Sequence, residues 1–283
     1  MQHPHVGSYV PTVSVIVPAY NEARNLEVVL PTLPPVHEVI VVDGGSADDT
    51  VETVRRVMPT ARLVQQTRKG KGNALACGFE AATGDILVMF DADGSADPGE
   101  IEPMVATLVA GADVAKGSRH LPDGGSEDLT VVRGLGNRAL TVAVNTLYRT
   151  RYTDLCYGYN AFWRDVLVYL DLPDTTLPPE ETPWGDGFEI ETVINCRIAA
   201  ASLTVTEVPS VERCRIHGES NLHAVRDGLR VLRTILRERF RLRALRTAAA
   251  DRHRAHRVRL RALRATDRAV AVSAPATLTE VAP

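Results

Sequence analysis

Cysteine, aromatic residues and long apolar runs are all scarce in this sequence. Its four cysteines, at positions 77, 156, 196 and 214, show no CxxC or Cys/His spacing, so we expect neither a disulfide scaffold nor a structural zinc site. The longest apolar runs, such as residues 86–90, have five residues, whereas a helix that spans a membrane needs about 20. The first residues also lack the basic and apolar regions of a signal peptide, so we expect a cytoplasmic protein.

What the sequence does contain is typical of a globular protein, with 45% hydrophobic and 24% charged residues. Its formal charge of −3 hides an asymmetry: residues 224–268 hold 15 arginines and four acids, so they carry +11 and the rest of the chain −14. From residue 221 to about 245, apolar residues recur every three or four positions, which predicts an amphipathic helix with an arginine-rich face. Such a helix can bind an anionic membrane surface, or it can pack on the core with a solvated basic face.

Short apolar strands alternate with helical patterns through the first third of the chain. We expect strands at residues 13–17, 38–42, 63–64, 86–90 and 114–115, with helices between them. Because these runs are apolar almost throughout, they predict an α/β fold with a mostly parallel central sheet that is buried on both faces. In such sheets, ligands bind beyond the carboxyl ends of the strands.

The connecting segments carry further signals. Asn21 stands where it can cap the first helix, and residues 46–49 have capping-box spacing for the second. Residues 121–128 are rich in Gly, Asp and Ser and indicate a mobile loop, and residues 134–149 indicate an apolar helix. We predict four parts: an N-terminal extension (1–11), a main α/β domain (12–222), an arginine-rich amphipathic helical segment (223–268) and a disordered tail (269–283).

Two carboxylates follow the predicted strand at residues 86–90. Asp91 and Asp93 are two positions apart, so their side chains project to the same side. They can share one hard divalent cation and leave coordination sites for a diphosphate. The alternative is that both aspartates only stabilise a turn. Their position at the ligand-binding edge of the sheet favours the metal site.

Polar residues also follow the first two predicted strands. Asp43 precedes two glycines that let a ligand approach the backbone. This pattern favours a contact with a nucleoside, and the alternative is a turn aspartate that bonds its own backbone. Tyr20 and Glu22 end the neighbouring strand and can flank base and ribose, although Glu22 also suits the first turn of a helix.

Basic residues are placed where they can meet phosphate groups. Residues 68–73, with the sequence RKGKGN, run into a helix N-terminus, which favours phosphate binding as much as it favours a solvated basic turn. Arg119, Arg133 and Arg138 bracket residues 121–128, and guanidinium groups suit phosphate oxygens. Arg215 precedes the basic helix and supplies another cation.

Several segments together resemble glycosyltransferase family 2. They are VSVIVPAYNEARNL (13–26), VVDGGSADDT (41–50), KGKGNAL (69–75), AATGDILVMFDADGSADP (81–98) and GSRH (117–120). Within that family the chain is most similar to the polyprenyl-phosphate sugar synthases, from about residue 12 to residue 236. The resemblance implies a GT-A fold and a glycosyltransferase that uses Mg²⁺ or Mn²⁺ and a UDP- or GDP-linked sugar.

The resemblance also implies roles for individual residues. Asp91 and Asp93 match the metal-binding DxD, and Arg119 and Arg133 would act with them in catalysis. The residues implied to bind the nucleotide sugar are Pro18, Tyr20, Glu22, Asp43, Gly45, Lys71, Asp91 and Arg215. Those implied to bind the acceptor are Arg133, Asn137 and Ser220. The chain departs from the family's usual residues at Gly44, Ser95, Asn137 and Asn221.

Three functions fit these residues. The first is inverting transfer of a sugar to a polyprenyl phosphate at the inner face of the cell membrane, where the ionised acceptor requires no protein base. The second is transfer to a hydroxyl of a glycan or natural product, which needs a carboxylate base; the candidates are Asp186, Glu189 and Glu191.

The third is a non-catalytic protein whose basic helix holds a membrane or nucleic acid. The intact pair Asp91 and Asp93 argues against this function. Arginine-rich helices bind nucleic acid non-specifically, but the sequence contains no aromatic stacking platform, so we expect no specific nucleic acid partner. A homo-oligomer is compatible with the sequence.

Overall fold

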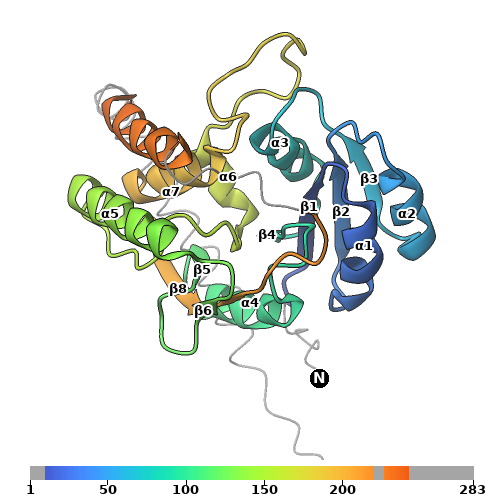
Figure 1. Ribbon diagram of the computed structural model, residues 1–283, viewed down its shortest axis with the longest axis horizontal. Helices are drawn as coiled ribbons and strands as arrows, with labels where there is room; N and C mark the ends of the chain where they lie inside the picture. Colours follow the sequence, from blue (N-terminus) through green and yellow to red (C-terminus); the bar gives the residue numbers. More distant parts are fainter. Residues whose placement is uncertain (1–9, 219–225, 242–283) are drawn as a thin grey trace, which may run out of the picture. The chain divides into compact units, whose positions relative to one another are not determined.

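A seven-stranded sheet forms the centre of the fold. In the computed structural model, which describes residues 10–218 and 226–241, the strand order is β3-β2-β1-β4-β7-β5-β8 (Figure 1). The strands are β1 Val13–Ala19, β2 Glu38–Asp43, β3 Arg62–Gln65, β4 Ile86–Met89, β5 Val114–Ser118, β7 Asn160–Trp163 and β8 Val205–Pro209. All neighbouring strands are parallel except β7, which is antiparallel to β4 and β5. The predicted α/β fold with a mostly parallel sheet is confirmed.

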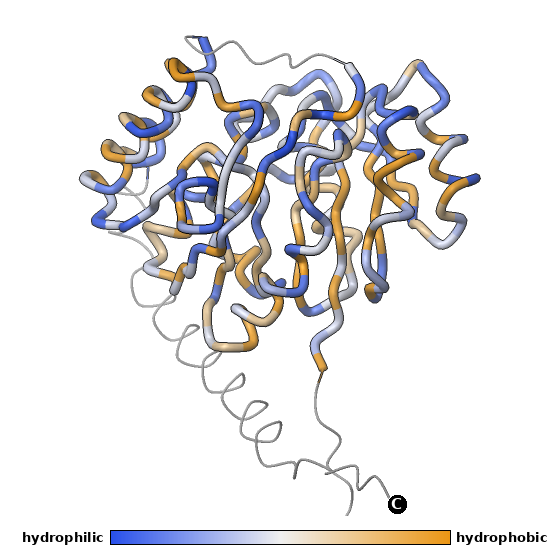
Figure 2. The backbone as a smooth tube through the Cα atoms, turned by 60° about the horizontal axis from the view of Figure 1, so that its bottom comes forward, coloured by the Kyte–Doolittle hydropathy of each residue, from blue (hydrophilic) through white to orange (hydrophobic). Residues whose placement is uncertain are grey.

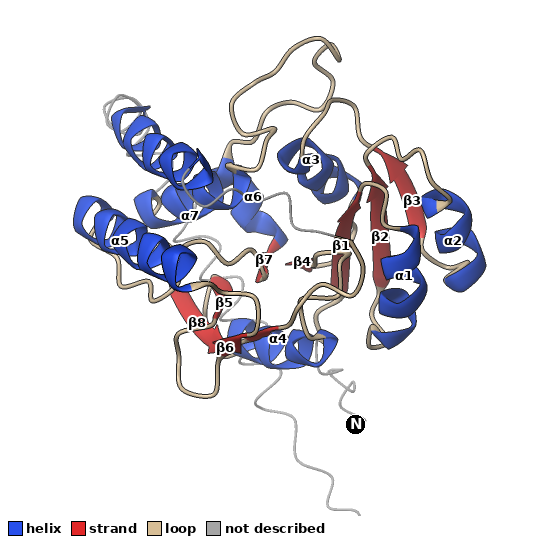
Figure 3. Cartoon of the chain, in the orientation of Figure 1, coloured by secondary structure: helices blue, strands red, loops and turns tan. Residues whose placement is uncertain are grey.

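Helices cover both faces of the sheet (Figure 3). They are α1 Ala23–Val29, α2 Thr50–Val57, α3 Lys71–Ala81, α4 Ile101–Val109, α5 Val131–Tyr148, α6 Leu167–Leu170 and α7 Ile190–Ala200. Short 3₁₀ turns at Leu30–Thr32, Pro98–Glu100 and Arg164–Val166 join some of them to their neighbours. Residues 226–241 are also helical. α1, α2 and α4 pack on one face, and α3, α6 and α7 pack on the other.

Alternate residues of each strand belong to two separate cores. Val15 and Val17 of β1 lie in the core with α1 and α4, whereas Ile16 between them lies in the core with α3 and α7. All three are fully buried, because successive side chains of a strand point to opposite faces of the sheet. Burying one such side chain contributes about 1.5–3 kcal/mol. Figure 2 shows the result as apolar strands in the middle of the fold.

A third, smaller core joins α5, α7 and the helix at residues 226–241. Val144, Cys196 and Ile235 pack together there, and the Tyr148 hydroxyl donates a hydrogen bond to the Ile235 carbonyl at 3.0 Å. Arg197 of α7 forms a buried ion pair with Glu238 at 2.8 Å. These contacts fix α5 and the helix at residues 226–241 side by side, as Figure 1 also shows.

Three local predictions were wrong. Residues 121–128 do not form a loop throughout, because β6 (Gly125–Ser126) pairs with β9 (Val211–Glu212) in a separate two-stranded sheet. Asn21 does not cap α1; its side chain accepts from the Ala47 amide at 2.8 Å. No capping box opens α2, which begins at Thr50, and the Asp48 carboxylate accepts from the Thr50 amide at 3.1 Å.

The apolar stripe that predicts the basic helix faces away from the protein. Leu229, Leu232, Leu236 and Phe240 are all exposed, whereas the buried positions of the same helix are Thr234, Ile235 and Glu238. Within the described ranges, no helix is both long and apolar enough to span a bilayer. The rest of the predicted basic segment, the N-terminal extension and the tail lie outside the described residues, and the predicted domain boundaries stay predictions.

Candidate active site

The carboxyl ends of three neighbouring parallel strands bring the predicted ligand-binding segments together. β2, β1 and β4 are adjacent, so the residues that follow them share one edge of the sheet. A pocket of about 510 Å³ opens there, which we call the donor pocket. Its described lining is Pro18, Ala19, Tyr20, Glu22, Gly44, Gln66, Lys69, Gly70, Lys71, Ala74, Asp91, Ala92, Asp93, Phe188 and Arg215.

Asp91 and Asp93 use their carboxylates differently. Asp93 accepts a hydrogen bond from the Ser95 amide at 3.0 Å, as expected of a turn aspartate. The Asp91 side chain is 40% exposed and faces Lys71, the first residue of α3, whose Nζ lies 2.7 Å from Asp91 Oδ1. Both carboxylates line the donor pocket. Asp93 therefore stabilises the turn, while the Asp91 carboxylate faces the pocket.

Lys71 links the DxD to a carboxylate far along the chain. Its Nζ also lies 2.7 Å from Glu191 Oε1 on α7. Burial lowers the pKa of Lys71, but Asp91 and Glu191 outweigh that effect, so the net pKa lies above its ordinary value. A positively charged Lys71 therefore lies against Asp91.

Asp43 is buried at the end of β2, and its carboxylate is engaged with its own loop. It accepts from the amides of Gly45 at 3.1 Å and Ser46 at 3.2 Å. These are the bonds of the turn aspartate that was the alternative interpretation. Asp43 and Gly45 are absent from the described lining of the donor pocket, so their contact with a nucleoside stays a prediction.

The segment at residues 213–217 lies across the DxD turn. The Ile216 amide donates to the Asp93 carbonyl at 3.0 Å, and the Arg213 amide donates to the Ser95 carbonyl at 2.8 Å. This placement brings Arg215 to within 2.9 Å of Glu22 on the other side of the donor pocket. The predicted acceptor residue Ser220 lies outside the described residues.

The basic loop at residues 68–73 is mostly committed to packing. Arg68 is buried in an ion pair with Asp186 at 2.6 Å, and the Gly72 amide at the start of α3 donates to the Asp186 carbonyl at 2.8 Å. A Cβ at Gly70 would lie 2.0 Å from that same carbonyl oxygen. The amides expected to bind phosphate therefore bind a protein carbonyl, and the loop's lysines are the groups that reach the pocket.

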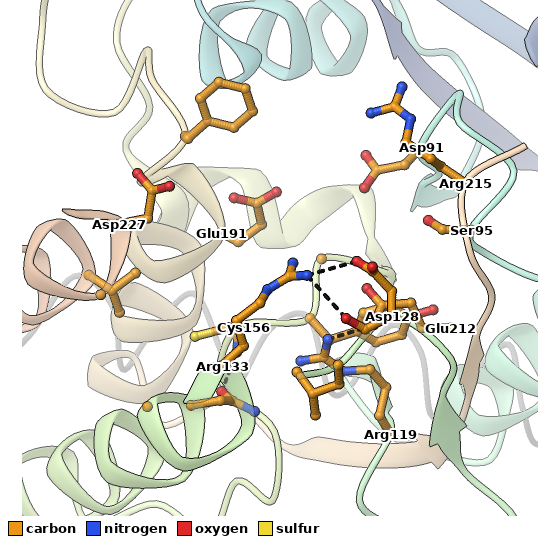
Figure 4. Close-up of a pocket in the computed structure, with 18 of the residues that line it drawn as sticks. Asp91, Ser95, Arg119, Asp128, Arg133, Cys156, Glu191, Glu212, Arg215 and Asp227 are labelled. Carbon is orange, nitrogen blue, oxygen red and sulfur yellow. Dashed lines mark hydrogen bonds and ion pairs between the residues drawn. The ribbon is translucent and has the colours of Figure 1, made fainter. Parts of the chain in front are cut away.

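A second pocket, of about 550 Å³, continues from the DxD toward α5; we call it the acceptor pocket. It shares Lys71, Asp91, Asp93, Phe188 and Arg215 with the donor pocket. Figure 4 shows Asp91, Arg215 and Ser95 at the upper right, Glu191 and Asp227 at the upper left, and Arg119, Arg133, Asp128 and Glu212 below them. All six cationic side chains of its described lining are ion-paired: Lys71, Arg119, Arg133, Arg213, Arg215 and Arg230.

Arg119 is the centre of a buried network. Its Nε and Nη2 donate to the two carboxylate oxygens of Asp154 at 2.7 and 2.9 Å, and its Nη1 donates to Glu212 at 2.9 Å. Asn137 Nδ2 also donates to Asp154, at 2.8 Å. Burial raises the pKa of Asp154, but Arg119 outweighs it and holds that pKa far below the ordinary value. Asp154 thus stays charged and fixes both Arg119 and Asn137.

Arg133 is held more loosely. It pairs with Asp128 at 2.8 Å, and the side chains are 23% and 44% exposed. Arg138, also considered from the sequence, is exposed and is not among the described lining residues. Arg133 is therefore the arginine of this loop that an incoming anion can reach with the least rearrangement.

Comparison with known proteins assigns the chain to a family. The model of glycosyl transferase family 2 matches residues 14–169, which is more than half of the chain. The chain belongs to glycosyltransferase family 2. This glycosyltransferase is 30% identical over 220 residues to undecaprenyl-phosphate mannosyltransferase of Micrococcus luteus, with 74% of this chain and 87% of that protein covered. It is 37% identical over 172 residues to glycosyltransferase AglD of Haloferax volcanii, which covers 56% of this chain and 27% of that longer relative.

A solved structure shares the fold. Glucosyl-3-phosphoglycerate synthase from Mycobacterium tuberculosis, crystallised with Mn²⁺, UDP-glucose and phosphoglyceric acid, is 25% identical and superimposes with a TM-score of 0.61. The match covers 81% of this chain and 80% of that one. The predicted GT-A fold and the assignment as a glycosyltransferase are thus confirmed.

The donor set of this glycosyltransferase fits a hard divalent cation. Asp91 and Asp93 offer carboxylate oxygens at the pocket wall, and hard cations such as Mg²⁺ and Mn²⁺ prefer oxygen ligands. No group of three or more His, Cys, Asp or Glu that could hold a metal occurs in the described part of the chain. Asp91 and Asp93 would hold such an ion when it is bound.

The predicted site residues fall into three groups. Pro18, Tyr20, Glu22, Lys71, Asp91, Asp93 and Arg215 meet at the donor pocket, and Arg119, Arg133, Asn137 and Glu191 at the acceptor pocket. Two of the candidate bases lie elsewhere: Asp186 pairs with Arg68, and Glu189 accepts from the Gly185 amide at 3.0 Å. The sequence interpretation missed Asp154 and Glu212, because they meet Arg119 from 35 and 93 positions away.

Proposed function

We propose that this glycosyltransferase transfers a sugar, with inversion, from a UDP- or GDP-linked donor to a polyprenyl phosphate, and that it requires Mg²⁺ or Mn²⁺. The observation that carries the proposal is that Asp91 and Asp93 line both pockets. A sugar whose diphosphate lies at these carboxylates would face an acceptor that enters through the acceptor pocket. The name of the Micrococcus luteus relative supports a polyprenyl phosphate as that acceptor.

The charges of the acceptor pocket suit a phosphate. A phosphate monoester is ionised near neutral pH, so its oxygen can attack the anomeric carbon without giving a proton to the protein. The bond to the nucleoside diphosphate breaks, and its electron pair leaves with the diphosphate. Arg133 is paired with a half-exposed aspartate and can exchange that partner for the acceptor phosphate, while Arg119 stays fixed by Asp154.

Charge on the leaving diphosphate must be stabilised in the transition state. When bound, Mg²⁺ or Mn²⁺ at Asp91 and Asp93 would supply most of this stabilisation as a Lewis acid. Lys71 and Arg215 line the same pocket and would add two protein cations to it. Tyr20, which is 63% exposed, offers its ring for stacking on the base.

A hydroxyl acceptor is the second candidate, and Glu191 is the observation that favours it. Among the three candidate bases, Glu191 alone is in the described lining of the acceptor pocket. The solved relative, which is crystallised with UDP-glucose and phosphoglyceric acid, supports a small hydroxyl-bearing acceptor. Against this role, Glu191 is already engaged in an ion pair with Lys71 at 2.7 Å.

We also propose that the protein acts as a peripheral protein on the cytoplasmic face of a membrane. Polyprenyl phosphates are found in membranes, and two helices beside the acceptor pocket carry large exposed apolar side chains. On α5 these are Val131, Val132, Leu135 and Val142, and on the helix at residues 226–241 they are Leu229, Leu232, Leu236 and Phe240. Arginines on the second helix would add attraction to anionic lipid headgroups.

A transfer assay tests the proposal. Purified protein is mixed with undecaprenyl phosphate, Mg²⁺ or Mn²⁺ and each radiolabelled UDP- or GDP-sugar in turn, mannose first. We expect a labelled, acid-labile lipid that disappears when a chelator is added.

The variant Glu191→Gln separates the two acceptors. Transfer to a phosphate should survive within about tenfold, since no base is needed, whereas transfer to a hydroxyl should fall by about 10²–10⁴. Two results together would replace the first function with the second. They are donor binding without labelling of the lipid, and loss of transfer to a hydroxyl acceptor in Glu191→Gln.

A further inference from the structure

The acceptor pocket changes character along its length. Near the DxD it is lined by charged side chains, whereas α5 and the helix at residues 226–241 add apolar side chains and glycines beside Arg133, Asn137, Asp227 and Arg230. We call this second part the helix slot. It is formed by Val132, Gly136 and Leu140 of α5 and by Gly228 and Val231 of the neighbouring helix. One continuous space therefore leads from a charged end to an apolar end.

Two glycines face the slot where side chains could stand. A Cβ built on Gly136 or on Gly228 meets no atom of the described residues within 4 Å. Glycine in a helix is unfavourable compared with alanine, and here neither close packing nor a positive φ requires it. The glycines thus leave open a volume that any larger residue would occupy.

The walls of the slot are held at a fixed separation. Further along both helices, Tyr148 donates its hydrogen bond to Ile235, and Arg239 lies over the Tyr148 ring at 5.8 Å. The buried pair between Arg197 and Glu238 ties the second helix to α7. The two helices are therefore in contact at one end and separated at the glycines, so the slot is built into the packing.

The polar side chains beside the slot are engaged with protein partners. On α5, Arg133 pairs with Asp128 and Asn137 donates to Asp154, and on the second helix Asp227 and Arg230 pair with each other at 3.2 Å. A sugar or a peptide would need hydrogen-bond partners there, whereas a hydrocarbon chain needs only apolar contact. Val132 lines the slot and is also 64% exposed, so the slot can be entered from outside the protein.

We propose that the helix slot binds the phosphate-proximal isoprene units of the acceptor lipid. This inference rests on the proposed function, because it takes the acceptor to be a prenyl phosphate whose phosphate lies near Arg119 and Arg133. The slot selects for a hydrocarbon chain attached to that phosphate and leaves the rest of the lipid outside, beside the exposed apolar side chains of the two helices.

Binding measurements on variants of the whole chain test the slot. Gly136→Leu and Gly228→Leu fill it from opposite walls, and Ala139→Leu is the matched control, because Ala139 is exposed on α5 and is not in the described lining. Calorimetry is done with farnesyl phosphate and with inorganic phosphate. We expect the wild type to bind farnesyl phosphate at least about 30-fold more tightly than inorganic phosphate.

Both slot variants should lose at least about tenfold in affinity for farnesyl phosphate and keep the wild-type affinity for inorganic phosphate, while Ala139→Leu changes neither. Thermal melts check that each variant is folded, and Gly136→Ala should melt no lower than the wild type. Equal binding of both phosphates by the wild type, or wild-type binding of farnesyl phosphate by both slot variants, would overturn the inference. Failure of lipid transfer with intact, slot-dependent binding would instead contradict the proposed function alone.

Discussion

The two ends of this active site are built in different ways. Apart from Phe188 and Arg215, the donor end comes from short segments at the ends of parallel strands of one sheet, within residues 18–93. The acceptor end gathers residues from α5, from the loops at residues 154–158 and 212–215, from α7 and from the helix at residues 226–241. One end thus depends on local sequence and the other on long-range packing, so mutations should affect them differently.

The ends also differ in how their charges are satisfied. At the donor end, Asp43 is satisfied by backbone amides and Asp91 by a lysine that a metal could replace. At the acceptor end, arginines are matched by carboxylates whose burial differs, since Asp154 is fully buried and Asp128 is not. Buried pairs hold geometry, whereas exposed pairs can exchange partners.

The largest effect should come from the DxD. Asp91→Asn or Asp93→Asn removes a charged oxygen ligand from the proposed metal site, and we expect sugar transfer to fall by about 10³-fold or more. Because the Asp91 side chain is 40% exposed and Asp93 bonds within its own turn, the melting temperature should change little. Initial rates and thermal melts measure the two quantities.

Asp123→Asn is the control for this substitution. Asp123 is exposed on a loop with φ of 67°, which Asn also adopts readily. If the DxD variants retained transfer close to that of Asp123→Asn, the proposed metal site would be wrong.

The next largest effect distinguishes the buried ion pair of Arg119 and Asp154 from the more exposed pair of Arg133 and Asp128. Asp154→Asn leaves Arg119 buried beside a neutral group and should cost about 3–5 kcal/mol of unfolding free energy. Asp128→Asn should cost less than about 1 kcal/mol. Denaturant titrations of both variants measure the difference, and similar losses in the two would show that burial does not distinguish the pairs.

The Asp154 pair also predicts a pH dependence. Because Arg119 holds the pKa of Asp154 below its ordinary value, the pair stabilises the fold above the unfolded-state pKa of about 3.9. This stabilisation is lost as the pH falls further toward the lowered folded-state pKa. The unfolding free energy should therefore fall less steeply below about pH 4 in Asp154→Asn than in the wild type, as measured by urea titration across that range.

A smaller effect should follow the loss of Lys71. Lys71→Met leaves Asp91 and Glu191 without their shared cation and removes one positive charge from the donor pocket. We expect kcat/KM to fall by about 10–100-fold. The control is Arg55→Met, since Arg55 is an exposed residue of α2 that pairs with Glu52 and is in neither described pocket lining. Equal rates in the two variants would exclude a role for Lys71.

The smallest effect concerns stability at a site beneath the acceptor end. Lys116 is fully buried on β5 and donates to the Tyr157 carbonyl at 2.8 Å. Burial lowers its pKa, so between the lowered folded-state pKa and about 10.4 the unfolded state binds more protons. Wild-type stability should therefore rise with pH in that window.

Lys116→Met removes the titratable group that causes this dependence of stability on pH. We expect it to flatten that rise and to add about 1 kcal/mol near pH 7, because a buried charge is replaced by an apolar chain of similar length. Guanidinium titrations at neutral and alkaline pH test this, and a loss of stability at neutral pH would contradict it.

The contrast between the two ends explains which features could be predicted from the sequence. Strands such as β1 and β4 are apolar runs bounded by polar turns, and the residues after them must lie at one edge, so the DxD, Tyr20 and Glu22 could be placed. The position of β7 between β4 and β5 could not be predicted, because strands that pair over a long sequence separation leave no periodic signal of that pairing. For the same reason Asp154 could not be matched with Arg119.

The errors at helix starts have a related cause. Asn21 and residues 46–49 carry the side chains that usually cap helices, but Asn21 bonds across to the neighbouring loop at Ala47. Local patterns do not reveal which of two nearby partners a polar side chain selects. The loop at residues 68–73 has the same ambiguity, since glycines before a helix suit a phosphate and suit close packing equally.

That close packing at Gly70 and Gly72 limits how this chain can be recombined with a relative. A Cβ at either glycine would clash with the carbonyl of Asp186 or Gly185, so the start of α3 packs closely against the loop before α7. A chimera of two enzymes would therefore have to take the start of α3 and the loop before α7 from the same parent. A crossover after the loop at residues 185–187 would keep these contacts within one parent, and it would leave Arg119, Arg133 and Asn137 with the N-terminal half that carries the DxD.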